Sequence, residues 1–142
     1  MSTIMPIDNH YASLAYYTDT KIVHHCFHKA LDSHHLRVVL NTGIDFLQKY
    51  QATKWLSDNR EIDPHSDEDT LWINTDWLPR ALEAGWKYWA LVVPDSVKSK
   101  MNMTEFVNWF YDHDVRIMVF VNAEAALRWL ENVDSQHEAP AT

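Results

Sequence analysis

The chain has 142 residues, long enough for one domain with a buried core, and 46% of them are hydrophobic. Its formal net charge of −8 opposes binding to nucleic acid or to an anionic membrane surface, and no apolar run reaches the ~18 residues of a membrane-spanning helix. The single cysteine, Cys26, excludes an intrachain disulfide and, in the absence of a signal peptide, favours a cytoplasmic location.

Two strands joined by a hairpin are the first predicted elements. Their strand-like runs, Tyr11–Tyr17 and Lys21–His28, are separated by only three residues.

A helix is expected over residues 33–50, with Asp32 as its N-cap and apolar side chains recurring every 3.6 residues. Gly43 lies inside this helix, where it costs about 1 kcal/mol relative to Ala, so we expect close packing at that position.

The middle third of the chain has the pattern of a strand–helix–strand unit. Lys54–Ser57 is a short apolar strand, and Ser66 and Asp69 have the spacing of a capping box that begins the next helix. We expect Pro79 to kink or break this helix and Gly85 to end it.

The last third repeats the alternation of strand and helix. It predicts strands at Trp86–Val93 and Val115–Val121, a helix over about 103–113 between them, and a final helix capped by Asn122. Residues 134–142 are expected to form a flexible tail. The predicted fold class is therefore α/β, with a single mixed, mostly parallel five-stranded sheet flanked by helices in the order β-β-α-β-α-β-α-β-α.

Polar residues follow the third predicted strand. In open α/β sheets ligands gather beyond the carboxyl ends of the strands, where Asp58, Asn59 and Arg60 are expected to lie. Asp58 and Arg60 can pair with each other, cap local backbone groups, or contact a partner to which Arg60 offers a directional charge.

The acidic loop and two tryptophans are expected to extend this surface. Asp63 and Ser66 bound the loop, whose following acidic residues suit a first helical turn but could also serve a cation or an acid–base reaction. Trp72 and Trp77 lie five positions apart, so they do not share a helix face, and an exposed one is a candidate interface anchor. The predicted binding residues are Asp58, Asn59, Arg60, Asp63, Ser66, Trp72 and Trp77.

Three other residues raise the possibility of a metal site. His24, Cys26 and His28 alternate along one strand, so they share a face, and they are of the types that bind zinc. Alternate strand residues lie ~6–7 Å apart, whereas zinc bonds measure ~2.0–2.3 Å, so three collinear ligands converge poorly. The other interpretation is a half-exposed strand with one small thiol.

The seven tryptophans allow two interpretations, and the two glycines exclude several sites. Most of the indoles fit a core, and together they could also line a pocket for a small apolar ligand. The indoles are those of Trp55, Trp72, Trp77, Trp86, Trp89, Trp109 and Trp129. With only two glycines, neither a P-loop, nor a dinucleotide fingerprint, nor a Gly-x-Ser-x-Gly nucleophile turn can be built, and we expect no cofactor.

The segment Trp55–Leu130 resembles the STAS-like (SpoIIAA-like) domain family of small bacterial proteins. The resemblance rests on three elements: Trp55-x-x-Asp58-x-Arg60, Trp77-x-Pro79-Arg80 and Ala84-Gly85. It implies a single STAS-like domain over residues 1–133 without known catalytic activity. In better-studied STAS domains a partner kinase phosphorylates a serine within Asp-Ser-Ser/Thr-Gly. This chain has no such tetrapeptide, and no glycine follows Ser66, which occupies a loosely equivalent place.

The resemblance implies a non-enzymatic binding or regulatory role through contacts with a protein partner or with a second copy of the chain in a homodimer. Two alternatives remain open from the residues themselves. One is a carrier for a small apolar, lipid-like ligand held among the tryptophans. The other is a metal-dependent enzyme that uses the acidic loop or His24, Cys26 and His28.

Overall fold

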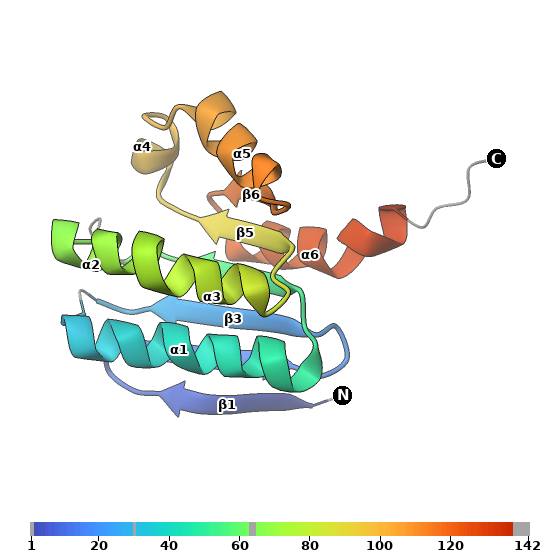
Figure 1. Cartoon of the computed structure of the whole chain (residues 1–142), viewed down its shortest axis with the longest axis horizontal. Coiled ribbons are helices and arrows are strands. Elements are labelled where there is room, and N and C mark those ends of the chain that lie inside the picture. Colours follow the sequence, from blue (N-terminus) through green and yellow to red (C-terminus); the bar gives the residue numbers. More distant parts are fainter. Residues whose placement is uncertain (1, 30, 63–64, 138–142) are drawn as a thin grey trace.

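The computed structural model describes residues 2–29, 31–62 and 65–137, which form a mixed sheet flanked by helices (Figure 1). The strands are β1 (Thr3–Asp8), β2 (Ala12–Tyr17), β3 (Ile22–Phe27), β4 (Lys54–Asp58), β5 (Tyr88–Val92) and β6 (Arg116–Phe120). The helices are α1 (Ser33–Tyr50), α2 (Asp67–Trp72), the π-helical η1 (Ile73–Trp77), α3 (Leu78–Glu83), α4 (Asp95–Lys98), α5 (Met103–Asp112) and α6 (Ala123–His137). Within the described ranges, no helix is both long and apolar enough to cross a bilayer.

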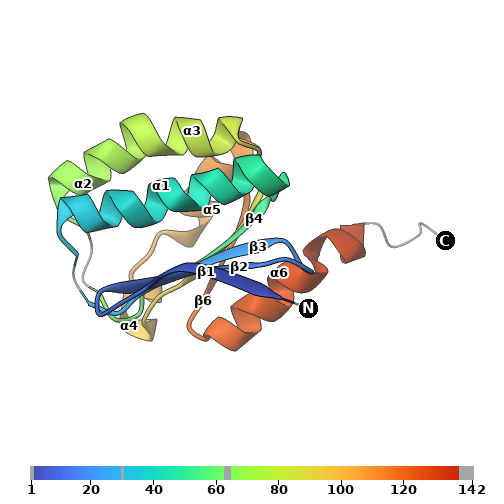
Figure 2. The same ribbon diagram turned by 90° about the horizontal axis from the view of Figure 1, so that it is seen from below.

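The strands lie in the sheet in their chain order, from β1 at one edge to β6 at the other. β1, β2 and β3 pair antiparallel, whereas β3 to β6 are parallel. Right-handed crossovers that always step in the same direction place their helices on one face of the sheet. Figure 2 shows this arrangement, with α1, α2–α3 and α5 on one face and α6 alone on the other.

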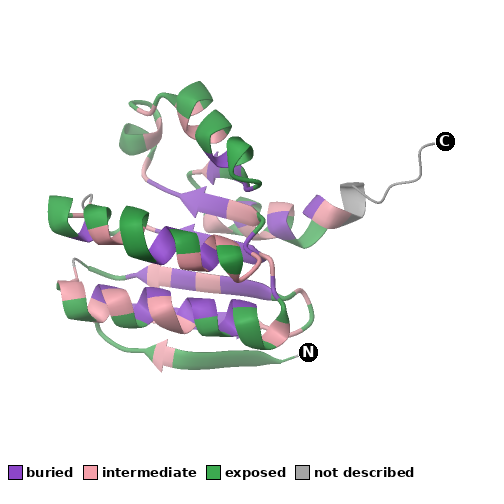
Figure 3. Ribbon diagram, viewed as in Figure 1, coloured by how far each residue is buried: buried purple, intermediate pink, exposed green. Residues whose placement is uncertain are grey.

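The described part of the sheet has six strands, so the prediction of five was wrong. The missed strand, β1, pairs with β2, and its register shifts between Ile4 and Ile7, around Pro6. Proline lacks the amide hydrogen that a strand interior needs, so edge strands and bulges are its usual places. β1 is exposed along almost its whole length (Figure 3), so it lacks the apolar alternation that reveals a strand in a sequence.

The core has one cluster on each face of the sheet. The larger cluster packs α1, α3 and α5 against Leu14, Val23 and Trp55, and the smaller one packs α6 against Ile22 and Leu56. Period-two alternation along each strand sends neighbouring residues to opposite clusters.

Gly43 faces Trp55 across the larger cluster, and the expected close packing at this position is confirmed. A Cβ at Gly43 would lie 2.6 Å from Cζ3 and 2.7 Å from Cζ2 of Trp55, and nearer still to Cη2. Only a residue without a side chain lets the helix and the indole approach this closely.

Several predicted helix ends are confirmed. At Pro79, where a kink or a break was predicted, the helix does not break, and it changes type just before the proline. Asp32 and Ser66 accept hydrogen bonds from the third backbone N–H after each of them, as N-caps do. Before Pro79 the chain widens into η1, where Leu78 N–H donates to Ile73 O, five residues back. The helix thus continues through a residue that cannot donate a backbone hydrogen bond. Gly85, with φ of 108°, ends α3 as predicted.

The final helix continues past the predicted start of a tail. α6 runs to His137, and Asp134 accepts a hydrogen bond of 2.8 Å from Lys54 Nζ on β4. Residues 138–142 lie outside the described part of the chain.

Candidate functional site

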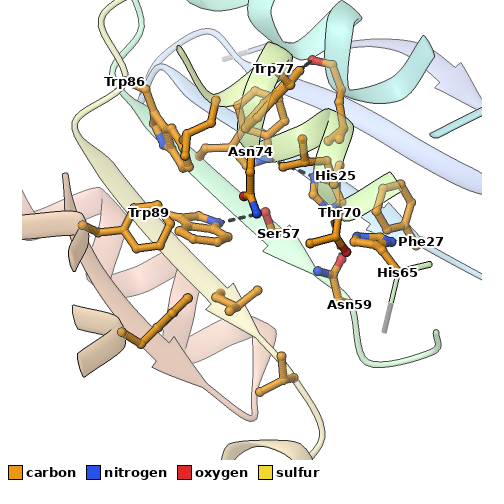
Figure 4. Close-up of a pocket in the computed structure, with 18 of the residues that line it drawn as sticks. His25, Phe27, Ser57, Asn59, His65, Thr70, Asn74, Trp77, Trp86 and Trp89 are labelled. Atoms are coloured by element: carbon orange, nitrogen blue, oxygen red, sulfur yellow. Dashed lines mark hydrogen bonds between the residues drawn. The ribbon is translucent and has the colours of Figure 1, made fainter. Parts of the chain in front are cut away.

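A pocket of about 670 Å³ opens on the sheet face that carries α1, α3 and α5 (Figure 4). Its aromatic lining comprises Phe27, Trp55, Trp77, Trp86, Trp89, Phe106, Trp109 and Phe110. Its aliphatic lining comprises Leu40, Ile73, Leu78, Leu91, Val93, Val97 and Met101. Its polar lining comprises His25, Ser57, Asn59, His65, Thr70 and Asn74. The lining therefore comes from the strands β3 to β5, from α1, from the continuous helical segment α2–η1–α3, and from the segment over α4 and α5.

Strand alternation positions the floor of the pocket. Trp55, Ser57 and Asn59 occupy every second position along β4 and its exit, so all three project toward the helices. Trp89 and Leu91 have the same relation on β5. The π-helical turn supplies Ile73, Asn74 and Trp77, and such turns occur often at functional sites.

Four tryptophans form a continuous wall of the pocket. The ring centroids of Trp55 and Trp77 lie 5.3 Å apart, those of Trp77 and Trp86 5.6 Å, and those of Trp86 and Trp89 5.2 Å, all three pairs in edge-to-face geometry. Each of the four indole N–H groups donates to a protein acceptor. The rings therefore keep no unmet polar group and offer apolar surface to an occupant.

His25 sits beneath this wall in a hydrogen-bond relay. Trp55 Nε1 donates to His25 Nδ1 at 2.9 Å, and His25 Nε2 lies 3.1 Å from Asn59 Oδ1. Because an indole nitrogen can only donate, Nδ1 must accept, which assigns the proton to Nε2 and makes Nε2 the donor to Asn59. Burial lowers the pKa of His25 from 6.5 to about 3, so the imidazole is neutral in a neutral solution.

The hydroxyl of Ser57 is the second buried polar group of the floor. Trp89 Nε1 donates to Ser57 Oγ at 2.9 Å, and the residue is only 4% exposed. Buried hydroxyl hydrogens normally have an acceptor. Within the described residues, the hydroxyl hydrogen of Ser57 has none. The chain therefore leaves a buried donor facing the pocket.

The described lining of the pocket has no aspartate, glutamate, lysine or arginine. His65, near the mouth, contacts the edge of Phe27 at 6.1 Å between ring centroids, and burial lowers its pKa. A charged ligand would lose its hydration here without gaining a counter-ion. The site therefore favours neutral molecules.

Two of the predicted binding residues, Asn59 and Trp77, line the pocket. Asp58 and Arg60 do not, because alternation turns Asp58 to the opposite face of β4. There Arg60 Nη2 contacts Asp58 Oδ2 at 2.7 Å, and the Asp58 side chain is 5% exposed. Burial alone would raise the pKa of Asp58, but the hydrogen bonds and charge of Arg60 outweigh it and lower the pKa. The structure thus shows the pairing alternative for these two residues.

The remaining predicted binding residues lie elsewhere. Trp72 contacts two guanidinium groups: its ring centroid lies 4.9 Å from Arg37 Cζ and 6.0 Å from Arg80 Cζ. Ser66 caps α2 and is not among the lining residues. Asp63 lies outside the described residues.

The side chains of His24, Cys26 and His28 do not converge on a metal centre. His24 Nδ1 bonds Tyr17 Oη at 2.8 Å, and Cys26 Sγ lies 3.9 Å from His28 Nδ1. Burial raises the pKa of the Cys26 thiol to about 11, so the thiol stays protonated in a neutral solution. In the described part of the chain, no three His, Cys, Asp or Glu residues are grouped to hold a metal ion.

The sequence interpretation missed His25 and gave Ser57 no role of its own. The sequence held a signal in both cases. Alternation along β3 places His25 on the opposite face of the sheet from His24 and Cys26, and alternation along β4 places Ser57 on the same face as Trp55 and Asn59.

Comparison of the chain with protein-family models, with curated proteins and with solved structures gave no match. The STAS-like resemblance therefore stays a prediction, and any functional proposal depends on the pocket.

Proposed function

We propose that this protein binds a small, neutral, mainly apolar molecule in the pocket between α3 and α5. The observation that carries the proposal is an open volume of about 670 Å³ walled by tryptophans and floored by a few buried polar groups. Small-molecule sites usually have volumes of roughly 300–1,000 Å³ and combine apolar walls with a few polar groups that orient the ligand.

The exposed mouth of the pocket supports entry from solvent. Trp109 is 45% exposed and Val97 is 37% exposed, although both line the pocket. A tightly packed core would bury such side chains and leave few voids larger than a water molecule. An apolar ligand that covers these surfaces would be stabilised by the hydrophobic effect.

Binding without chemistry is favoured by the connections of the polar floor. A nucleophilic serine needs a base within hydrogen-bond reach of its hydroxyl. Both nitrogens of His25 are engaged, one with Trp55 and one with Asn59, so this imidazole is not placed to take the proton of Ser57.

A regulatory role through protein contacts, and self-association as a homodimer, stay predictions from the resemblance. The predicted surface is divided by the sheet, since Asn59 faces the pocket while Asp58 and Arg60 pair on the other face. Ligand binding and protein contact are compatible, because a carrier can present its ligand-bound surface to a partner.

The proposal is tested by titration with N-phenyl-1-naphthylamine, a neutral apolar dye whose fluorescence rises in apolar sites. We expect saturable binding to the wild type and much weaker binding of the anionic dye 1-anilinonaphthalene-8-sulfonate. Val97→Trp should fill the mouth and weaken binding of the neutral dye by about tenfold or more, which corresponds to about 1.4 kcal/mol.

The matched control is Val38→Trp, because Val38 is 42% exposed on α1 and does not line the pocket. This variant should bind the dye as the wild type does. The proposal fails if the wild type shows no saturable binding, or if the two variants bind with equal affinity.

A further inference from the structure

The direction of each hydrogen bond on the pocket floor is fixed by groups that can only donate. Trp55 fixes the tautomer of His25, and His25 Nε2–H in turn fixes the oxygen of Asn59 as its acceptor. The amide nitrogen of Asn59 therefore lies on the other side of the amide, and Figure 4 shows it turned away from His25. Within the described residues the two N–H hydrogens of Asn59 have no acceptor.

Ser57 has the same donor character for a similar reason. Its oxygen accepts the indole N–H of Trp89, so its own hydrogen must point away from that indole. A buried hydroxyl hydrogen left without an acceptor costs free energy, and a ligand atom that accepts it removes this cost. Ser57 and Asn59 are alternate residues on one face, ~6–7 Å apart along the chain, so both donors serve the same compartment.

Each acceptor atom of His25, Ser57 and Asn59 already takes part in one hydrogen bond. His25 Nδ1 accepts the indole N–H of Trp55, and Asn59 Oδ1 accepts the Nε2–H of His25. One lone pair of Ser57 Oγ accepts the indole N–H of Trp89. A ligand donor at Ser57 or Asn59 would have to share an oxygen that already accepts a hydrogen bond, whereas a ligand oxygen or ring nitrogen would meet free hydrogens. The polarity of the floor therefore selects among neutral ligands.

We infer that the ligand of this pocket is an apolar molecule with a neutral hydrogen-bond acceptor, a carbonyl oxygen or an aromatic ring nitrogen, that receives hydrogen bonds from Ser57 and Asn59. This inference rests on the proposed function and specifies its ligand class. The neutral state of His25 keeps this donor pattern constant at every pH well above the His25 pKa of about 3.

The test compares two ligands of nearly equal shape, 2-acetylnaphthalene, which has a carbonyl acceptor, and 2-isopropenylnaphthalene, which has a methylene in its place. Each displaces bound N-phenyl-1-naphthylamine, and the measured quantity is the affinity ratio of ketone to alkene. Comparing this ratio between protein variants cancels the different hydration of the two ligands.

In Ser57→Ala we expect the ketone-to-alkene ratio to fall by about three- to tenfold, the effect of one lost hydrogen bond. Ser99→Ala is the matched control, because Ser99 is exposed, its hydroxyl donates to Ser96 O, and it does not line the pocket. Its ratio should equal that of the wild type. A measurement on the wild type keeps the inference testable if Ser57→Ala does not fold. In the infrared spectrum, the carbonyl stretch of bound 2-acetylnaphthalene should lie at lower frequency than that of the same ketone in hexane.

The inference is overturned if the ketone-to-alkene ratio is the same in the wild type and in Ser57→Ala, or if the bound carbonyl stretch matches that in hexane. In either outcome both ligands still displace the dye, so the proposed function survives. If neither ligand nor the dye binds the wild type, the proposed function itself fails.

Discussion

Replacing Gly43 by alanine tests how the close approach of α1 and Trp55 shapes both the core and the pocket. Alanine is the better helix former by about 1 kcal/mol, so local propensity alone predicts stabilisation. The added Cβ, however, would overlap the six-membered ring of Trp55, with atoms at 2.6 and 2.7 Å and one nearer still. The two effects have opposite signs, and the packing decides which is larger.

Trp55 has little freedom to move away from the new methyl group. Its ring lies edge-to-face with Trp77 at 5.3 Å and tilted against Trp86 at 6.3 Å, and its N–H is held by His25. Overpacking of a core costs about 1–3 kcal/mol, and so severe an overlap belongs at or above the upper end. We expect a net loss of about 2 kcal/mol and a fall in Tm of about 4–8 °C.

Urea unfolding followed by far-ultraviolet circular dichroism measures this loss, and a double-mutant cycle identifies its cause. Trp55→Phe removes the overlapping ring atoms, so Gly43→Ala in that background should be neutral or stabilising. Gly85→Ala is the control: no atom lies within 4 Å of the new Cβ, but φ of 108° strains any residue with a side chain. Its cost should be the same in both backgrounds. The reasoning is refuted if Gly43→Ala costs as much beside Phe as beside Trp.

Two further predictions concern buried ionisable groups. The free energy of unfolding should fall as pH drops from about 6.5 toward 4, because His25, with its pKa lowered from 6.5 to about 3, takes up a proton in the unfolded state before the folded one. The expected contribution is about 1.4 kcal/mol per pH unit for one proton, and His25→Gln should flatten the pH profile of urea unfolding. Arg60→Ala should cost about 1–3 kcal/mol because it leaves the buried Asp58 carboxylate without its partner. Adding Asp58→Asn to the Arg60→Ala variant should recover part of that loss. An unchanged urea midpoint in Arg60→Ala alone would contradict the prediction.

Much of the fold follows from signals that act over a few residues. Asp32 and Ser66 cap helices because a side-chain oxygen reaches an amide three positions on, and Gly85 ends one because it adopts positive φ. The alternation of apolar residues and the strand–helix–strand order predicted the mixed, mostly parallel sheet. β1 escaped prediction because a bulged edge strand that contains Pro6 buries almost nothing, so it has no local pattern to detect.

The pocket, in contrast, was decided by tertiary structure. The sequence allowed the tryptophans to be either a solid core or the lining of a cavity, and spacing along the chain could not distinguish the two. That choice depends on the gap between α3 and α5, which is set by side chains distant in sequence that meet only in the folded chain. The same holds for Trp72 and Trp77: both precede α3 closely in the chain, yet Trp72 contacts two arginines and Trp77 lines the pocket. Periodicity assigns a residue to a face, but whether that face meets a neighbour or an open space is a property of the three-dimensional packing.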